Sequence, residues 1–430
     1  MTNILIISIA FIVLLLLGVP VAFSLGIPCL GYLLLCPELP ITVVSQNIMR
    51  HMLSFTLISM PGFLFVGRMM NTSGITDRLF KFAIAMVGRF RGGLAMANAL
   101  ASAMFAAMSG TAVGDAGGLG LVEMNMMKEA GYDDDVAAGI TAASSILGPI
   151  IPPSAAMVLL AAICELPVTY LFYGGVIPGV LLCGAMLINV AIRAHFTKKG
   201  RTWPSTKTPW RQALRTIPQA IPALFTFVII LGSILGGFCT ATEAAVVAAW
   251  YSILLGFCYK KATWKSIWKT LEETVAACGV FMLIVSIATF LAWIFTKENL
   301  TGYLASFLTK FSAGSQVPMM LICVVVFLMI GCFLDTSAAV LLLAPIIIPV
   351  VKSIGIDPIH FGVVMVIALM IGIITPPFGI CLFVVSEVGN LPVRKTTAEA
   401  VKYIPAMVLV IILCVVFPQL ITWLPSVLLN

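Results

Sequence analysis

Charged residues are scarce in this chain, and their scarcity excludes a soluble globular protein. Lys, Arg, Asp and Glu together make up 10% of the 430 residues, whereas a soluble domain contains roughly 25%. Hydrophobic residues make up 61% of the sequence. They form runs near the ~20 residues that a helix needs to cross a bilayer. We therefore predict an all-α polytopic membrane protein.

Paired cysteines and clusters of Cys with His are also lacking. The eleven cysteines are scattered, mostly inside apolar segments, without a C-x-x-C pair. This pattern is typical of buried thiols, and we assign no catalytic residue, so we do not expect an enzyme. The net charge of +7 does not indicate a nucleic-acid partner, because the basic residues flank the apolar runs, as the positive-inside rule predicts.

The apolar runs outline the order of the membrane segments. No Lys or Arg precedes the first run, so we interpret it as a retained first span rather than a signal peptide. Two amphipathic stretches, 76–90 and 300–313, are expected to lie along the interface. A basic linker covers residues 195–215. The apolar runs are 3–17, 20–36, 53–71, 94–128, 134–164, 169–193, 219–236, 241–258, 274–296, 318–351, 358–388 and 403–426.

The second half of the chain repeats the first at an offset of 224 residues. The hydropathy pattern follows this shift, and six residues recur in one register. The pairs are Lys128 and Lys352, Gly131 and Gly355, Asp133 and Asp357, Gly148 and Gly372, Pro152 and Pro376, and Pro153 and Pro377. We predict a duplicated fold with repeats at 1–193 and 219–430, joined by a cytoplasmic linker at 194–218.

Two of the apolar runs are interrupted near their middle. Segment 94–128 breaks at Ser109-Gly-Thr111, and segment 318–351 breaks at Asp335-Thr-Ser337. If each is a re-entrant hairpin, every repeat crosses the membrane five times and the second repeat is inverted. With the linker in the cytoplasm, 20 of the 24 basic residues lie inside and both termini outside. A run of plain crossings is the alternative.

Segments 134–164 and 358–388 are broken helices in which a cation could bind. The consecutive prolines remove N–H donors and force the helix open. The freed carbonyls of residues 146–149 are hard oxygen ligands, and helix N-termini restarting near Ser154 and Phe378 favour an anion. Inverted repeats with broken helices are typical of secondary transporters, whose sites lie near the midplane. Hydroxyl groups near the breaks come from Thr141, Ser144, Ser145 and Thr375.

Acidic residues inside the membrane are candidate functional groups. Asp115 follows the first hairpin tip and Asp335 lies at the second. Glu123 is either a third such group or a partner of Lys128. Helix-capping roles are expected for other acidic residues, namely Glu243, Asp133, Asp134, Asp135 and Asp357. Neither hairpin interior contains Lys or Arg, so we expect an anionic substrate to be compensated by bound cations rather than by a fixed arginine.

These motifs resemble the large membrane subunit of tripartite ATP-independent periplasmic (TRAP) transporters along nearly the whole chain. The motifs are Ser109-Gly-Thr-Ala-Val-Gly-Asp115, Lys128-x-x-Gly-Tyr-Asp133, Ala142-Ala-Ser-Ser-Ile-Leu-Gly-Pro-Ile-Ile-Pro-Pro-Ser154, Gly331-Cys-Phe-Leu-Asp-Thr336 and Gly372-Ile-Ile-Thr-Pro-Pro-Phe-Gly379. The resemblance implies sodium-driven uptake of a carboxylate across the bacterial inner membrane by an elevator motion. It also implies two partners, a small four-span membrane subunit and a periplasmic substrate-binding protein.

The resemblance also implies where sodium and substrate bind. The expected sodium positions are Ser109, Gly110, Thr111, Gly148, Pro152, Gly331, Asp335, Thr336, Gly372 and Thr375. The expected substrate positions are Ser109, Asp115, Ser154, Asp335 and Ser337. The two breaks differ in sequence, so the two ion sites need not be chemically equal, and the small subunit is not fused before the first span. The run Gly114-Asp-Ala-Gly-Gly-Leu-Gly120 is similar to sialic-acid-type members, although C4-dicarboxylates and other sugar or keto acids are also substrates of the family.

Two other functions are compatible with parts of the pattern. Divalent-anion/sodium symporters share inverted hairpins and act without a binding protein, but their Ser-Asn-Thr tip motif is absent here. An intramembrane aspartyl protease could use Asp115 and Asp335 as a dyad. Its Gly-x-Gly-Asp pattern fails, however, because residue 112 is Ala, and it leaves the duplication unexplained.

Overall fold

The computed structural model describes residues 6–7, 9–11, 13–14, 17–36, 38–40, 42–52, 55–205, 210–300, 302–303, 306 and 315–429. All regular secondary structure in these ranges is helical. Five of the described helical segments are long and apolar enough to cross a membrane, and further apolar helices are shorter. The chain is therefore a multi-pass helical membrane protein.

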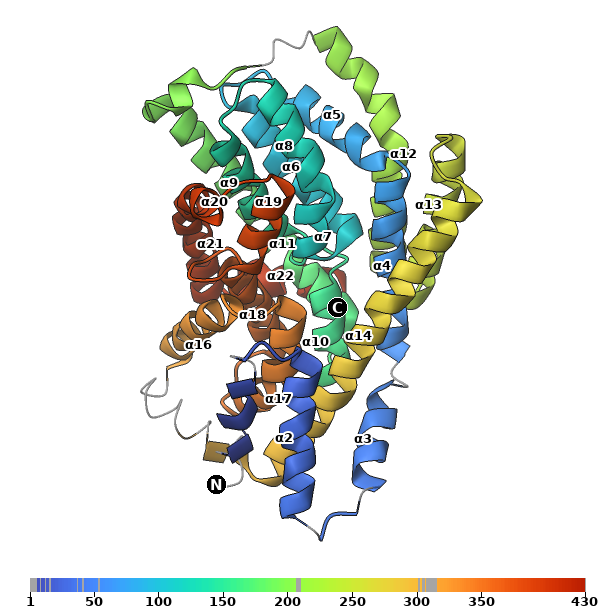
Figure 1. Cartoon of the computed structure of the whole chain (residues 1–430), viewed down its shortest axis with the longest axis vertical. Helices are drawn as coiled ribbons and strands as arrows, with labels where there is room; N and C mark the ends of the chain where they lie inside the picture. Colours follow the sequence, from blue (N-terminus) through green and yellow to red (C-terminus); the bar gives the residue numbers. More distant parts are fainter. Residues whose placement is uncertain are drawn as a thin grey trace.

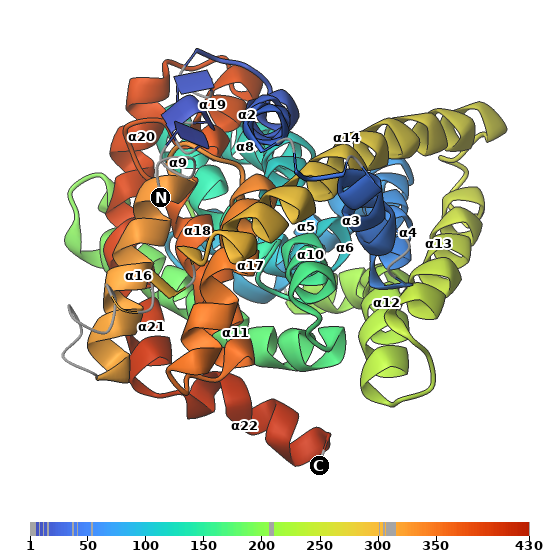
Figure 2. The same cartoon turned by 90° about the horizontal axis from the view of Figure 1, so that it is seen from below.

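One group of helices packs around α4 and α14, and its members α4, α12 and α13 lie on the right side of the molecule in Figures 1 and 2. Helix α4 packs against α13 and α14, and α5 packs against α12. The stretch expected to be amphipathic near residue 80 is helix α5, which buries Ile75, Leu79, Phe80 and Ala83 on one stripe. This group consists of α2 (Val21–Leu35), α3 (Thr42–Met52), α4 (Phe55–Thr72), α5 (Ile75–Val87), α12 (Trp210–Leu235), α13 (Ala241–Cys258) and α14 (Trp264–Lys297).

The remaining helices of the first half contain the expected interruptions. The first hairpin, residues 93–129, turns at Gly110 and Thr111, and the helix after it opens over residues 148–154, here called the first break. An additional interruption at Gly118, which was not expected, separates α7 from α8. These helices are α6 (Gly93–Ser109), α7 (Ala112–Gly117), α8 (Leu119–Glu129), α9 (Asp134–Ser144), η1 (Ser145–Leu147), α10 (Ala155–Cys164) and α11 (Val168–Phe196).

The second half has the same order of helix, turn and break. The second hairpin, residues 316–353, turns at 332–335, and the second break covers residues 373–379. Helices α7 and α9 begin 224 residues before α17 and α18, at the offset found in the sequence. These helices are α16 (Gln316–Gly331), α17 (Thr336–Ser353), α18 (Pro358–Gly372), α19 (Ile380–Val388), α20 (Val393–Ala400), η3 (Val401–Tyr403), α21 (Ile404–Val416) and α22 (Gln419–Leu428).

Three boundaries differ from the sequence expectation. Helix α12 begins at Trp210, inside the stretch expected to be a linker, because apolar residues continue there at helical spacing. Helix α14 begins at Trp264, ten residues before the apolar run, with Thr263 as its cap. The run at 403–426 is two helices separated at Phe417–Pro418. Most of the second amphipathic stretch, 300–313, and much of the first apolar run lie outside the described residues.

Glu243 and Asp357 cap helices through their side chains as expected, whereas Asp133 does not. Glu243 completes a capping box with Thr240 at the start of α13. The carboxylate of Asp357 accepts a hydrogen bond from the Ile359 N–H at the start of α18. Asp133 is the N-cap residue of α9 without a side-chain cap hydrogen bond. The carboxylates of Glu243 and Asp357 are therefore helix caps.

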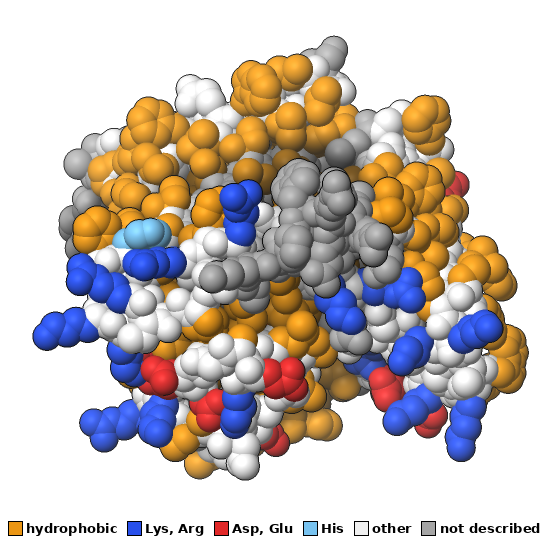
Figure 3. All heavy atoms as spheres, turned by 90° about the horizontal axis from the view of Figure 1, so that it is seen from above, with side chains coloured by type: hydrophobic (Ala, Val, Ile, Leu, Met, Phe, Trp, Pro, Cys, Tyr) orange, Lys and Arg blue, Asp and Glu red, His pale blue; other side chains and the backbone are white. Residues whose placement is uncertain are grey.

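Basic residues gather on the face shown in Figure 3, which is the upper end of Figure 1. The linker is fixed there by an ion pair of Lys199 with Asp135, 3.2 Å apart, and this hydrogen bond raises the pKa of the Lys199 ammonium. Beneath it, Arg193 forms an ion pair with Glu399 and lies over the ring of Trp203. The buried pair joins α11 to α20.

Candidate functional site

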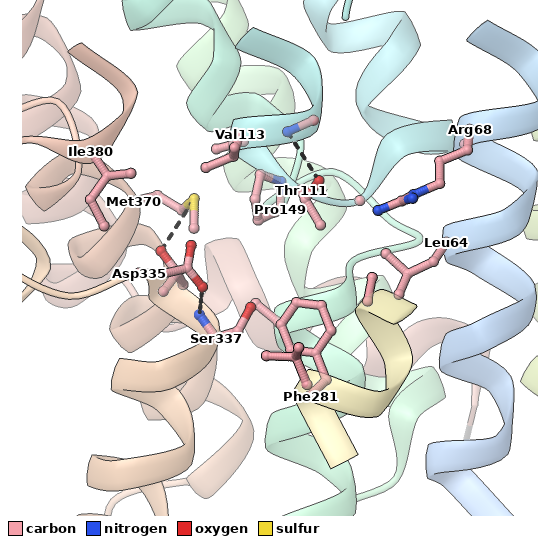
Figure 4. Close-up of a pocket in the computed structure, with 18 of the residues that line it drawn as sticks. Leu64, Arg68, Thr111, Val113, Pro149, Phe281, Asp335, Ser337, Met370 and Ile380 are labelled. Carbon is pink, nitrogen blue, oxygen red and sulfur yellow. Dashed lines mark hydrogen bonds between the residues drawn. The ribbon is translucent and has the colours of Figure 1, made fainter. Parts of the chain in front are cut away.

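A cavity of about 550 Å³ lies where the two hairpin tips meet the α4 and α14 helices. One wall is formed by the tips together with Pro149, Met370 and Ile380. The opposite wall comes from α4 and α14 and includes Leu64, Arg68, Asn71, Ala277, Val280 and Phe281. Figure 4 shows Thr111 and Asp335 on different elements around the same space. The cavity thus joins segments more than 200 residues apart.

The first hairpin tip contacts the first break. Thr111 caps α7, and its hydroxyl accepts a hydrogen bond from the Gly114 N–H at 3.3 Å. The Gly110 carbonyl accepts one from the Ala155 N–H, also at 3.3 Å. Gly110 has a φ of +61°, and a Cβ there would lie 3.2 Å from the Pro153 carbonyl oxygen. A side chain at residue 110 would therefore be strained and would crowd the break.

Backbone carbonyls in the first break are partly used within the break itself. The Leu147 carbonyl accepts hydrogen bonds from the N–H groups of Ile150 and Ile151. The Ser154 hydroxyl donates to the Pro149 carbonyl and accepts from the Met157 N–H at 3.2 Å, so it caps α10. Ser154 is fully buried, and this side chain does not line the cavity. The expected carbonyl cage is therefore only partly available to a cation.

The second hairpin tip presents a carboxylate to the cavity. Asp335 caps α17 and accepts a hydrogen bond from the Ser337 N–H at 2.9 Å. The Thr336 hydroxyl points to the Met370 sulfur, 3.8 Å away (Figure 4). Asp335, Thr336 and Ser337 all line the cavity. A carboxylate and hydroxyls at a helix start can bind a cation, whereas the N-terminal dipole favours an anion.

Gly331 and Gly372 have a packing role that the sequence did not reveal. A Cβ on Gly372 would lie 2.7 Å from the Cα of Gly331, so α16 and α18 cross with their backbones in contact. The Thr375 hydroxyl donates to the Ile371 carbonyl at 2.7 Å, within its own helix. None of these three residues lines the cavity.

The two breaks differ in exposure as well as in sequence. Pro152 and Pro153 are buried, whereas Pro376 and Pro377 are exposed. Both Pro–Pro bonds are cis. The chemical difference expected between the two breaks is therefore accompanied by a difference in their surroundings.

Arg68 was not predicted as a site residue, because charge counting placed it with the cytoplasmic basic residues. It projects from α4 into the cavity opposite Asp335 (Figure 4). Its guanidinium lies 3.6 Å from the Glu273 carboxylate of α14, and its side chain is 37% exposed. The only signal in the sequence is a single arginine inside an otherwise apolar segment.

The structure divides the predicted site residues into two groups. Those at the cavity are Gly110, Thr111, Asp335, Thr336 and Ser337. Those away from it are Asp115, Gly148, Pro152, Ser154, Gly331, Gly372 and Thr375. The backbone of Ser109 ends α6, but its side chain lies outside the described residues. Among the described residues, no group of three or more His, Cys, Asp and Glu could hold a metal ion.

The alternative pairing of Glu123 with Lys128 is wrong. Glu123 is completely buried, and Lys128 pairs with Asp134 at 3.2 Å. Lys128 is exposed in the last turn of α8, whereas Glu123 is buried in the middle of the same helix.

Comparison with known proteins identifies the family. The family described as "Tripartite ATP-independent periplasmic transporter, DctM component" matches residues 8–420. The sialic acid TRAP transporter large permease protein SiaM of Vibrio cholerae is 38% identical, covering 96% of each chain. The C4-dicarboxylate TRAP transporter large permease protein DctM of the same organism is 34% identical over 96% of this chain and 95% of the relative.

A solved structure shares the fold at low sequence identity. The YdaH transporter of Alcanivorax borkumensis superposes with a TM-score of 0.63 at 17% identity, covering 96% of this chain and 98% of that one. This likeness concerns the fold alone. The family match and the relatives over nearly the full length show that the chain belongs to the DctM component family of tripartite ATP-independent periplasmic transporters and is a transporter subunit, not an enzyme.

Proposed function

We propose that this chain moves a carboxylate, most specifically a sialic acid, across the bacterial inner membrane together with sodium ions. The observation that carries the proposal is the cavity enclosed by both hairpin tips and by α4 and α14. Its volume of about 550 Å³ lies in the range of small-molecule pockets, roughly 300–1,000 Å³. The relatives named for sialic acid and C4-dicarboxylate transport support the substrate class.

The substrate carboxylate binds between the tips and Arg68. Arg68 supplies positive charge, and the hydroxyl groups of Thr111 and Ser337 come from cavity-lining residues on the opposite wall. Arginine matches a carboxylate through two parallel hydrogen bonds. This role replaces the expectation that bound cations alone balance the substrate charge.

Sodium binds at the hairpin tips, where oxygen atoms gather. At the second tip, the ligands are the Asp335 carboxylate and the Thr336 hydroxyl, together with nearby backbone carbonyls. At the first tip, the ligands are the Thr111 hydroxyl and backbone oxygens near Gly148. Gly148 packs against this tip, because a Cβ added to it would lie 3.3 Å from the Thr111 carbonyl oxygen. Hard cations prefer such oxygen ligands. Sodium bound beside the substrate reduces the net charge that crosses the membrane.

The transport motion is an elevator movement of two inverted repeats. The two hairpins and broken helices carry the substrate, and α4 and α14 form part of the scaffold against which they slide. In Figure 1 the first hairpin occupies the upper half and the second hairpin the lower half, which supports inversion. The shared cavity wall is the sliding surface.

The chain works with a small membrane subunit and a periplasmic substrate-binding protein. It covers 67% of the sialic acid TRAP transporter permease protein SiaT of Haemophilus influenzae, and we infer that the rest of that relative includes the small subunit. The binding protein delivers the carboxylate to the outer face.

The proposal is tested with the chain and its small subunit in proteoliposomes, with a sialic-acid-loaded binding protein outside. An inward sodium gradient is expected to drive uptake, and Asp335→Asn is expected to abolish it because the tip loses its carboxylate. Glu243→Gln, which changes an exposed helix cap, is the matched control.

Three results would contradict parts of this proposal. Uptake without a sodium gradient contradicts symport, and full activity of Asp335→Asn contradicts the role of that residue. Uptake without the binding protein favours the stand-alone symporter instead. Uptake of a C4-dicarboxylate, but not of sialic acid, each supplied on its binding protein, would identify the C4-dicarboxylate as the substrate.

A further inference from the structure

Two carboxyl groups on neighbouring helices of the first hairpin are buried. Asp115 on α7 is 1% exposed, and Glu123 on α8 is 0% exposed. The helices that carry them, α7 and α8, pack against each other. None of their four carboxyl oxygens has a hydrogen-bond partner among the described residues. Such groups are costly to bury unless a proton or a cation compensates them.

No described cationic side chain approaches the pair from the packed elements. These elements are α5, α6, α9, η1 and α19, besides α7 and α8 themselves. Lys81 and Lys128 are exposed, and Cys381 is buried but carries no positive charge. The titratable or charged residues on these elements are Asp77, Arg78, Lys81, Lys128, Glu129, Asp134, Asp135, Cys381 and Glu387, of which the side chain of Asp77 lies outside the described residues. The Arg78 guanidinium lies over the ring of Tyr259, 3.4 Å from the ring centroid. A salt bridge therefore does not explain the pair within the described part of the chain.

The polar groups beside the pair already bond one another. The Ser102 hydroxyl lies close to the Asp115 carboxyl but donates to the Ser144 hydroxyl at 3.0 Å. Ser144 donates to the Asn98 amide oxygen at 2.7 Å, and the Asn98 amide donates to the Thr141 hydroxyl at 2.8 Å. A hard metal cation takes about six oxygen ligands, whereas a proton needs only the two carboxylates. The surroundings thus favour a shared proton.

The hairpin fold does not require these acids. At the offset of 224 residues, the positions of Asp115 and Glu123 in the second hairpin are taken by Ala339 and Ile347. Ala339 is fully buried, and Ile347 packs against the core. An apolar pair therefore fills the same place in the second repeat, so the acids of the first repeat serve a purpose other than packing.

The pair also lies next to the cavity. Ala112, Val113 and Gly114, the first three residues of α7, line it, and Asp115 follows on the same helix. A movement of the first hairpin tip would therefore change the access of water to Asp115.

We propose that Asp115 and Glu123 form a proton-binding site in the first hairpin, which takes up and releases a proton as the transporter moves its substrate. Uptake converts one carboxylate to a carboxylic acid that hydrogen-bonds to the other carboxylate, and release returns the proton to water. Release during transport rests on the function proposed above, whereas proton binding itself does not.

Proton binding is tested on the purified protein by infrared difference spectroscopy during a pH titration. The wild type is expected to show a carboxylic-acid carbonyl band that disappears as the pH is raised. Asp115→Asn and Glu123→Gln are each expected to lose that band, while Glu129→Gln, an exposed acid on the same helix, keeps it. A band that is absent, that does not titrate or that survives in both variants overturns the site. If neither variant folds, Ser102→Ala is expected to shift the pH of the transition, and an unchanged transition overturns the site.

Proton movement is tested in the proteoliposomes with a pH-sensitive dye in the lumen. Sodium-driven uptake by the wild type is expected to change the lumenal pH, and the change falls to background in Glu123→Gln but not in Glu129→Gln. Normal uptake and unchanged pH dependence in both Asn and Gln variants would mean a permanently protonated pair and would overturn the coupling. If sodium added at constant pH removes the band without any movement of protons, then Asp115 and Glu123 bind sodium. That result would also overturn the proposed proton coupling. A titrating band in a chain without sodium-driven uptake would instead refute the proposed transport function and leave the proton site standing.

Discussion

At the scale of single residues, Arg68 changes the chemistry expected at the site, because it adds a positively charged side chain to the cavity wall. Charge counting assigned it to the cytoplasmic side, because tracing the spans outward from the basic linker places the end of the 53–71 run in the cytoplasm. Its position at the cavity depends on α4 packing beside the hairpins, which are distant in sequence. Asp335, by contrast, was found from the sequence, because an acid at an interruption of an apolar run is itself unusual.

Replacement of Arg68 by Gln is expected to lower uptake of a carboxylate roughly 10- to 100-fold. A charged hydrogen bond to a carboxylate contributes about 1.5–3 kcal/mol, and each 1.4 kcal/mol is a factor of about ten in affinity. The measurement is the dependence of the initial uptake rate on the concentration of loaded binding protein in proteoliposomes.

The Glu273→Gln variant separates substrate binding from the ion pair. It removes the partner 3.6 Å from Arg68 but retains the guanidinium. We expect it to keep most of the wild-type uptake. Equal losses in the two variants would show that Arg68 acts only by holding α4 against α14.

At the scale of elements, the sequence located the helix interruptions near Gly110 and Asp335 and both breaks. The paired prolines recur at a fixed offset, and they force the backbone to leave the helix at a definite place. The sequence did not reveal which glycines open the chain and which allow helices to touch. Gly110 belongs to the first kind, with its φ of +61°, whereas Gly331 and Gly372 belong to the second. That distinction depends on the neighbouring helix.

Replacement of Gly372 by Ala is expected to destabilise the protein by about 1–3 kcal/mol, the usual cost of overpacking. The added Cβ would lie 2.7 Å from the Cα of Gly331 across the α16–α18 contact, and neither backbone can move aside cheaply. Thermal unfolding of the purified protein in detergent measures the effect.

Gly184→Ala is the matched control for this prediction. Gly184 lies inside α11, and an added Cβ meets nothing within 4 Å. Because alanine favours a helix by about 0.5–1 kcal/mol over glycine, this variant is expected to unfold at a slightly higher temperature. A melting temperature for Gly372→Ala equal to or above that of Gly184→Ala would contradict the packing role of the glycine pair.

At the scale of the whole molecule, the composition was sufficient to predict a multi-pass helical membrane protein. The longer α14 and the earlier start of α12 were missed, because charged residues such as Lys265 interrupt the apolar pattern without ending the helix. The buried environment of Glu123 was also beyond the sequence, since a carboxylate five residues before a lysine can face either water or the interior. Packing between distant helices decides such cases.

Inversion of the two repeats predicts that equivalent residues lie on opposite sides of the membrane. Glu129 and Ser353 are separated by 224 residues, and each is exposed at the end of its hairpin. In a background without the eleven native cysteines, Glu129→Cys is expected to react with a membrane-impermeant maleimide only after the cells are permeabilised. Ser353→Cys is expected to react in intact cells. Because parallel repeats would place both cysteines on one side, labelling of both in intact cells, or of neither, would refute the inverted arrangement and with it the count of 20 basic residues inside.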